Sequence, residues 1–117
     1  MTYQGLAQQW RYTVNMEKLV AYLMETGVLR TPEIIAAFRA VDRKDFVPAA
    51  YASEAYGDYP LPIGFGQTIS QPTTVAFMLE LLQSRAGDRV LDVGSGSGWT
   101  TALLAHIVGS GGKVFGI

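Results

Sequence analysis

The stretch VLDVGSGSGW, residues 90–99, places three glycines at every second position directly after a β-rich run. Gly94, Gly96 and Gly98 allow the backbone to turn sharply and to approach a ligand closely. The helical pattern that follows would present backbone N–H groups without intrahelical partners, which suits a polar ligand. Three alternating glycines exceed what a strand-to-helix turn needs, so the spacing predicts a cofactor-binding loop.

The position of the third glycine indicates which cofactor the loop binds. The dinucleotide fingerprint needs a glycine where this chain has the bulky Trp99. Asp92 precedes the alternating glycines, and the combination resembles the first motif of class I S-adenosylmethionine-dependent methyltransferases. The resemblance implies S-adenosyl-L-methionine as cofactor, its amino group oriented by the carboxylate; the simpler interpretation is a carboxylate that holds loop N–H groups. The cofactor-binding residues implied are Asp92, Gly94, Ser95, Gly96 and Gly98.

A second unusual stretch, PLPIGFGQTISQP at residues 60–72, contains three prolines, two glycines and no charged residue. Surface loops are usually more polar, and strands seldom tolerate so much proline and glycine. We interpret this stretch as part of a rigid connecting loop over residues 51–71 that is shaped to hold a ligand.

The order of four motifs over roughly residues 30–117 resembles the protein-L-isoaspartate O-methyltransferase family. The motifs are DRKDFVP, AYGDYPLPIGFGQTISQP, TTVAFMLELLQ and VLDVGSGSGW, and the Gln-Thr-Ile-Ser-Gln-Pro core is the specific part because generic methyltransferases lack it. The resemblance implies an enzyme that methylates the α-carboxylate of isoaspartyl residues in damaged proteins and peptides. The implied physiological role is protein repair.

The same resemblance assigns roles within the proline- and glycine-rich loop. Ser70 aligns with the active-site serine of the family, expected to place the substrate carboxylate beside the methyl group. A serine just before Pro72 is also typical of a helix cap, so both roles stay open. Tyr56 and Tyr59 are less favoured candidates for substrate contact. The substrate-binding residues expected are Gln67, Thr68 and Ile69.

Composition divides the chain into three expected parts: a helical segment at 1–50, the loop at 51–71, and the start of a Rossmann-like domain at 72–117. In the last part, a largely buried helix precedes a strand, the glycine loop, a helix and a second strand. Such a βαβ unit implies a parallel sheet with a right-handed crossover. The fold class expected is α/β, with N-terminal helices followed by the first βαβ unit of a class I methyltransferase sheet.

The N-terminal helices have recognisable boundaries. Asn15 is expected to cap a helix that Gly27 ends. The hydroxyl of Thr31 is expected to cap a second helix that Pro32 opens. The charged cluster Arg-Lys-Asp at residues 43–45 is interpreted as a solvated helix end.

Bulk composition narrows the class of protein further. The 117 residues include no cysteine and a single histidine, so no metal site, disulfide or thiol chemistry is expected. A formal net charge of −1 with interspersed signs gives no reason to expect a nucleic-acid or membrane partner. The N-terminus lacks the pattern of a signal peptide, and a cytoplasmic location is expected.

The sequence ends within its second predicted strand of the sheet, at Ile117. We therefore expect the N-terminal part of a longer enzyme, inactive by itself because the acidic residue that binds the cofactor ribose in this family would lie beyond residue 117. One alternative is a related methyltransferase acting on another carboxylate. Another is a non-catalytic module that self-associates through exposed sheet edges, and an NAD-binding domain is the weakest option.

Overall fold

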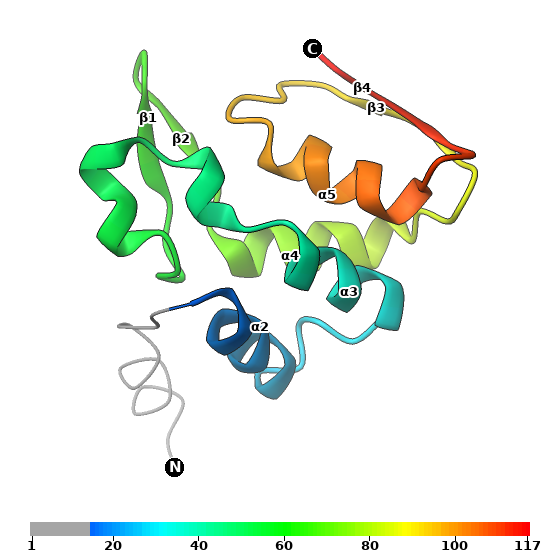
Figure 1. Ribbon diagram of the computed structural model, residues 1–117, viewed down its shortest axis with the longest axis horizontal. Coiled ribbons are helices and arrows are strands. Elements are labelled where there is room, and N and C mark those ends of the chain that lie inside the picture. Colours follow the sequence, from blue (N-terminus) through cyan, green and yellow to red (C-terminus); the bar gives the residue numbers. More distant parts are fainter. Residues whose placement is uncertain (1–14) are drawn as a thin grey trace.

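The computed structural model describes residues 15–117, in which a short parallel strand pair lies at one edge of the molecule, the helices lie on one side of it, and a hairpin is separate from it (Figure 1). The first part of the predicted helical segment, residues 1–14, lies outside the described residues. In chain order the elements are α2 (Met16–Glu25), α3 (Pro32–Ala40), η1 (Arg43–Phe46), η2 (Ala49–Glu54), β1 (Leu61–Gly64), β2 (Gln67–Ile69), α4 (Pro72–Leu82), β3 (Arg89–Asp92), α5 (Trp99–Val108) and β4 (Lys113–Gly116).

Helix α2 begins and ends as its sequence predicts. The side chain of Asn15 accepts a hydrogen bond from the backbone N–H of Lys18 at 2.9 Å, satisfying one of the unpaired donors of the first turn. Gly27 follows the helix with a φ of +83°, a left-handed conformation that glycine adopts without strain. The helix buries one apolar face, which comprises Met16, Leu19, Val20, Tyr22 and Leu23.

The hydroxyl of Thr31 does not cap helix α3, so this sequence prediction is wrong. Thr31 does occupy the N-cap position, but its hydroxyl donates to Oε1 of Glu80 at 2.5 Å. Oε2 of Glu80 accepts the backbone N–H groups of Arg30 and Thr31, both at 2.8 Å. A nearly buried carboxylate on α4 needs such donors, so the threonine hydroxyl serves Glu80 instead of its own helix.

The connection predicted as a loop contains a β-hairpin. Strands β1 and β2 pair antiparallel, with Leu61 opposite Ile69 and a bulge between Pro62 and Gly64. The turn at Gly64, Phe65 and Gly66 has positive φ throughout. Pro62 has no backbone N–H group to donate. Because each strand of a two-stranded hairpin is an edge strand, the missing hydrogen bond costs little stability, and proline is tolerated here.

The predicted parallel βαβ unit is confirmed. Strands β3 and β4 pair in parallel, from Arg89 opposite Lys113 to Asp92 opposite Gly116. Helix α5 connects them and lies between the strand pair and the α3–α4 helices (Figure 1). Its buried face is apolar and supplies much of the core, with Trp99, Leu103, Leu104, Ile107 and Val108.

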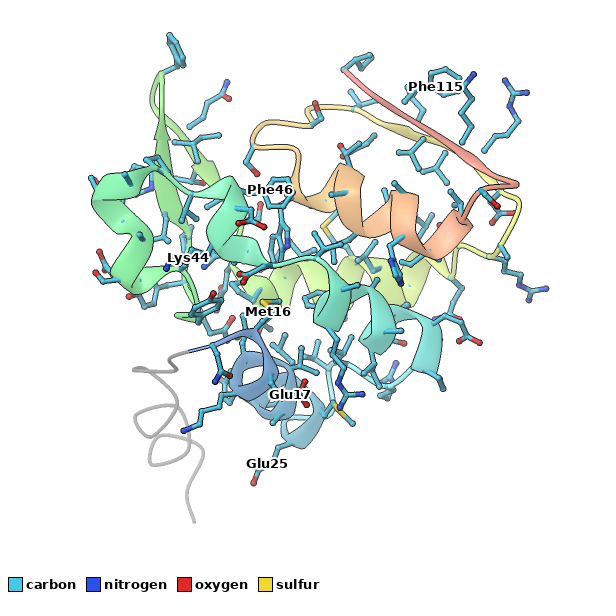
Figure 2. All side chains as sticks on the ribbon, in the orientation of Figure 1. Met16, Glu17, Glu25, Lys44, Phe46 and Phe115 are labelled. Atoms are coloured by element: carbon cyan, nitrogen blue, oxygen red, sulfur yellow. The ribbon has the colours of Figure 1, made fainter. Side chains whose placement is uncertain are left out.

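Helix α4 is less buried than its sequence predicts. One face packs into the core through Val75, Ala76 and Leu79, while the other exposes a set of large apolar side chains. Because apolar residues occur on all sides of α4, the sequence did not indicate which of its faces would pack against the other helices. Large apolar side chains are also exposed on and beside the strand pair, and Phe115 projects from β4 on the side away from α5 (Figure 2). The exposed set is Phe77, Met78, Leu81, Leu82, Leu91, Val93, Phe115 and Ile117.

Candidate active site

The glycine loop between β3 and α5 has the backbone conformation that its spacing predicts. Gly94, Gly96 and Gly98 have φ values of +75°, +51° and +87°, all in the left-handed region. The N–H groups of Gly94 and Ser95 both donate to the carbonyl of Ile117 at 2.9 Å. The loop is therefore a fixed turn, anchored to the residue that follows β4.

Asp92 stands at the end of β3, just before this loop. Its Oδ2 atom accepts a hydrogen bond from the hydroxyl of Thr101 on α5 at 2.6 Å. The interpretation that this carboxylate holds loop N–H groups is wrong for Gly94 and Ser95, whose donors go to a backbone carbonyl. Thr101 is a contact of Asp92 that sequence inspection missed, although it lies on the first turn of the predicted helix.

The end of β2 meets the glycine loop at a small polar cavity of about 60 Å³. This cavity brings together predicted substrate-side and cofactor-side residues that are more than 20 positions apart in the sequence. Gly98 is not part of its wall and instead forms the N-cap position of α5. The lining residues are Thr68, Ile69, Ser70, Asp92, Gly94, Ser95, Gly96, Ser97 and Thr100.

Gln67 lines a second, larger cavity of about 440 Å³ between the hairpin and η1. Gly96 and Ser97 belong to the walls of both cavities, so the two spaces adjoin at the glycine loop. Phe46 forms part of the opposite wall and lies between η1 and the loop that leads into α5 (Figure 2). The tip of the hairpin, Phe65, completes the rim with a fully exposed aromatic ring.

The interpretation of Ser70 as a helix cap is wrong. The N-cap position of α4 is Gln71, whose side chain makes no capping bond. Asp58 caps the helix from a distance, since its carboxylate accepts from the backbone N–H of Thr73 at 2.9 Å and from its hydroxyl at 2.6 Å. Within residues 15–117 the Ser70 hydroxyl forms no hydrogen bond, and this side chain lines the small cavity.

Arg43 is buried, not part of a solvated helix end. Its side chain is 0% exposed, and desolvation lowers the pKa of the guanidinium to about 10 even though the Asp58 charge acts to raise it. The group stays protonated at neutral pH and donates to four backbone carbonyls. Its neighbours Lys44 and Asp45 are exposed as predicted. A sequence pattern of three adjacent charges gives no sign of which one turns inward.

The two candidate tyrosines have structural partners. The Tyr56 hydroxyl donates to the carboxylate of Asp42 at 2.9 Å, and desolvation together with this bond raises the pKa of Tyr56 to about 12. Tyr59 donates to Glu54 at 3.1 Å. Neither tyrosine lines either of the two cavities at the glycine loop.

Metal-binding clusters and membrane-spanning helices are both absent from residues 15–117. Residues 15–117 contain no group of three or more His, Asp or Glu side chains arranged to hold a metal ion. No helix among them is both long enough and apolar enough to cross a membrane.

A parallel βαβ unit with an anchored glycine loop, joined to N-terminal helices and a hairpin that faces the loop, defines a Rossmann-like methyltransferase fold. The family model of protein-L-isoaspartate(D-aspartate) O-methyltransferase matches residues 14–117. The chain belongs to this family, as the sequence motifs predict.

Individual relatives agree with this assignment. A protein-L-isoaspartate O-methyltransferase of Anaeromyxobacter dehalogenans is 53% identical over 92 residues, which is 79% of this chain and 44% of the relative. Protein-L-isoaspartate O-methyltransferase 2 of Archaeoglobus fulgidus is 55% identical over 106 residues, covering 91% of this chain and 48% of the relative.

A solved structure shows the same fold. The crystal structure of a Plasmodium falciparum protein described as a protein-L-isoaspartate O-methyltransferase, in complex with S-adenosyl-L-homocysteine, superposes with a TM-score of 0.79 at 29% identity. The match covers 89% of this chain and 49% of that one. The chain thus spans less than half of the length of each of these relatives.

Proposed function

We propose that residues 15–117 form the cofactor-binding and substrate-positioning part of a methyltransferase that acts on isoaspartyl residues of damaged proteins. The observation that carries this proposal is the 60 Å³ cavity, where Ser70 and Thr68 from the hairpin side face the glycine loop. The catalytic role of Ser70, the substrate-binding roles of Gln67, Thr68 and Ile69, and a cytoplasmic location are parts of the same proposal.

The residues around the glycine loop fit S-adenosyl-L-methionine. Because Thr101 occupies only the Oδ2 atom of Asp92, the second carboxylate oxygen is available to accept from the amino group of the cofactor. A Cβ atom built on Gly94 or Gly98 meets nothing within 4 Å, so open space lies beside the loop. When bound, the cofactor supplies a methyl group on a sulfonium, and S-adenosyl-L-homocysteine in the Plasmodium relative supports this choice.

The substrate carboxylate needs to be positioned more than activated. A carboxylate oxygen is nucleophilic at neutral pH, so in-line attack on a methyl group requires orientation rather than a general base. The hydroxyls of Ser70 and Thr68 are neutral donors that hold an anion without the strong pairing of a guanidinium clamp. The adjoining 440 Å³ cavity, with Gln67 in its wall, gives room for the flanking peptide.

Two measurements test the proposal. Calorimetric titration of the chain with S-adenosyl-L-homocysteine is expected to give saturable binding. The full-length protein is expected to transfer a methyl group to an isoaspartyl peptide and not to the matched aspartyl peptide. Binding without methylation of the isoaspartyl peptide would leave a methyltransferase for another carboxylate, and the absence of both would refute the proposal.

A second candidate function is self-association of the 117-residue chain. The observation that favours it is the exposed apolar surface of α4, β3 and β4 defined above, since large exposed patches of this kind mark contact surfaces. Sedimentation of the chain over a range of concentrations is expected to show a dimer or larger species if this surface pairs with a second copy. A monomer at all concentrations would rule this candidate out.

A further inference from the structure

We propose that Arg43 is a positioning residue that fixes Ser70 relative to the glycine loop. The inference rests on the proposed function for its effect on catalysis. The structural part of the inference is that Arg43 forms a buried link between the substrate side and the cofactor side of the cavity. This part depends only on the contacts of Arg43.

The first half of this link is the fork of the guanidinium. Nη1 of Arg43 donates to the carbonyls of Ala55 and Gly57 at 2.9 and 3.1 Å. Nη2 donates to the carbonyls of Tyr59 and Ser70 at 2.9 and 3.2 Å. One planar group therefore joins the segment before the hairpin to the residue directly after it. The bond to Ser70 uses the backbone carbonyl, so it holds the residue in place without engaging the hydroxyl.

The second half of the link is the aromatic ring of Trp99. The guanidinium carbon of Arg43 lies 5.4 Å from the centre of this ring, a distance suited to a cation–π contact. Trp99 is the first residue of α5 and follows the glycine loop directly. Its ring is itself held by an edge-to-face contact with Phe38, at 5.6 Å between centroids. Arg43 therefore contacts both Ser70, which lines the small cavity, and Trp99, which follows the glycine loop.

Burying the Arg43 cation costs free energy, so its retention at this position calls for a role beyond packing. The ion pair found among residues 15–117 is the exposed Arg39–Glu17 contact, so no carboxylate lies within ion-pair distance of Arg43. Four carbonyls and a ring face compensate the charge, and the buried Nε atom lacks a partner. Even a buried ion pair can often be replaced by apolar side chains with no loss of stability. An arginine nevertheless offers what an apolar residue or lysine lacks, a rigid planar set of donors that reaches four acceptors at once.

The kinetic test compares Arg43→Lys and Arg43→Met in the full-length protein with a control, Arg39→Met, which removes an exposed arginine outside the site. Misplacing reacting groups by about 1 Å costs on the order of 100-fold in rate. We expect kcat to fall by about that factor in Arg43→Met and less in Arg43→Lys, while the Kd for S-adenosyl-L-homocysteine changes less than about threefold. The control is expected to match the parent protein.

A second measurement is independent of activity. The chain contains no cysteine, so cysteines introduced at the exposed positions Pro62 and Ala105 can carry spin labels on the hairpin and on α5. Pulsed electron resonance is expected to give a narrow distance distribution in the parent chain and a broader one in Arg43→Met. Arg39→Met, added to the same labelled pair, should leave the distribution narrow.

The outcomes separate the two proposals. An active parent protein whose Arg43 variants keep their kcat would overturn the inference. So would variants that lose cofactor binding, thermal midpoint and kcat together, because that pattern indicates general destabilisation. If the parent protein methylates no isoaspartyl peptide, the proposed function fails, and the distance measurement still decides whether Arg43 sets the spacing between hairpin and α5.

Discussion

The carboxylate of Asp58 caps helix α4 through Thr73, accepting from its backbone N–H at 2.9 Å and from its hydroxyl at 2.6 Å. Asp58 lies 15 residues before Thr73 in the sequence, and the β1–β2 hairpin separates the two residues along the chain. Because Asp58 accepts from a backbone N–H group in the first turn of α4, Ser70 is not needed as the cap of this helix. Ser70 can then present its hydroxyl to the small cavity.

Asp58→Ala is expected to destabilise the protein by about 1 kcal/mol, the usual cost of losing an N-cap. For a chain of this size that corresponds to a drop in thermal midpoint of roughly 4–8 °C, measurable by circular dichroism. The control is Glu25→Ala, because Glu25 projects away from α2 (Figure 2). The control should stay within about 0.5 kcal/mol of the parent, and an equal effect of both changes would contradict the cap.

Ser70→Ala is expected to leave stability unchanged and to lower turnover. Within the described residues the hydrogen bond of Ser70 uses its backbone carbonyl and not its hydroxyl, so removing the hydroxyl leaves no donor or acceptor unpaired. A hydrogen bond to a charged substrate group is worth about 1.5–3 kcal/mol, or roughly 10- to 100-fold in kcat/KM. Methylation of an isoaspartyl peptide by the full-length protein measures the loss. The control is Ser53→Ala on η2, and turnover equal to the parent in both variants would refute the assignment.

Local signals in the sequence predicted some elements well. The cap at Asn15, the end at Gly27 and the alternating glycines each act on their own few residues, so their effect is visible in a short window. The βαβ unit was predicted from the order of such local signals along the chain: strand, glycine loop, helix, strand. The glycine spacing also predicted that Gly94 belongs to a ligand site, whereas Ser70 was assigned to the site only through the family resemblance; both residues line one cavity.

Features that depend on distant partners were missed. Arg43 turns inward because carbonyls 12 to 27 residues downstream accept its donors, and no local pattern marks them. The hydroxyl of Thr31 donates to Glu80, which is 49 residues away in the sequence, and therefore does not cap helix α3 as expected. The hairpin was missed because proline and glycine disfavour strands in general, whereas a two-stranded edge tolerates both.

Gly96→Ala is expected to abolish binding of S-adenosyl-L-homocysteine and to destabilise the chain by about 1 kcal/mol. Gly96 has a φ of +51°, which alanine adopts only with strain, so the loop would shift away from its ligand-binding conformation. Gly111→Ala is the matched control, because that glycine has no positive φ and open space beside it. Calorimetric titration of both variants measures the difference. Binding by Gly96→Ala at the parental affinity would show that the loop conformation is not required.

Glu80→Gln is expected to destabilise the protein at neutral pH by about 1–3 kcal/mol, because a charged acceptor loses its bonds to Thr31 and Arg30. Desolvation acts to raise the pKa of Glu80, but these hydrogen bonds outweigh it and hold the pKa below its ordinary value of 4.5.

A carboxyl group whose pKa is lower in the folded state stabilises the fold above the unfolded pKa and loses that contribution as the pH falls through the folded pKa. The difference between parent and Glu80→Gln should therefore be full above pH 4.5 and shrink below it. Urea unfolding of both proteins at a series of pH values from neutral to acid measures this difference directly. Glu33→Gln, at an exposed carboxylate in the first turn of α3, is the control and should show a much smaller loss at neutral pH. A difference for Glu80→Gln that stays constant into the acid range would mean that the Glu80 charge is not what holds α3 and α4 together.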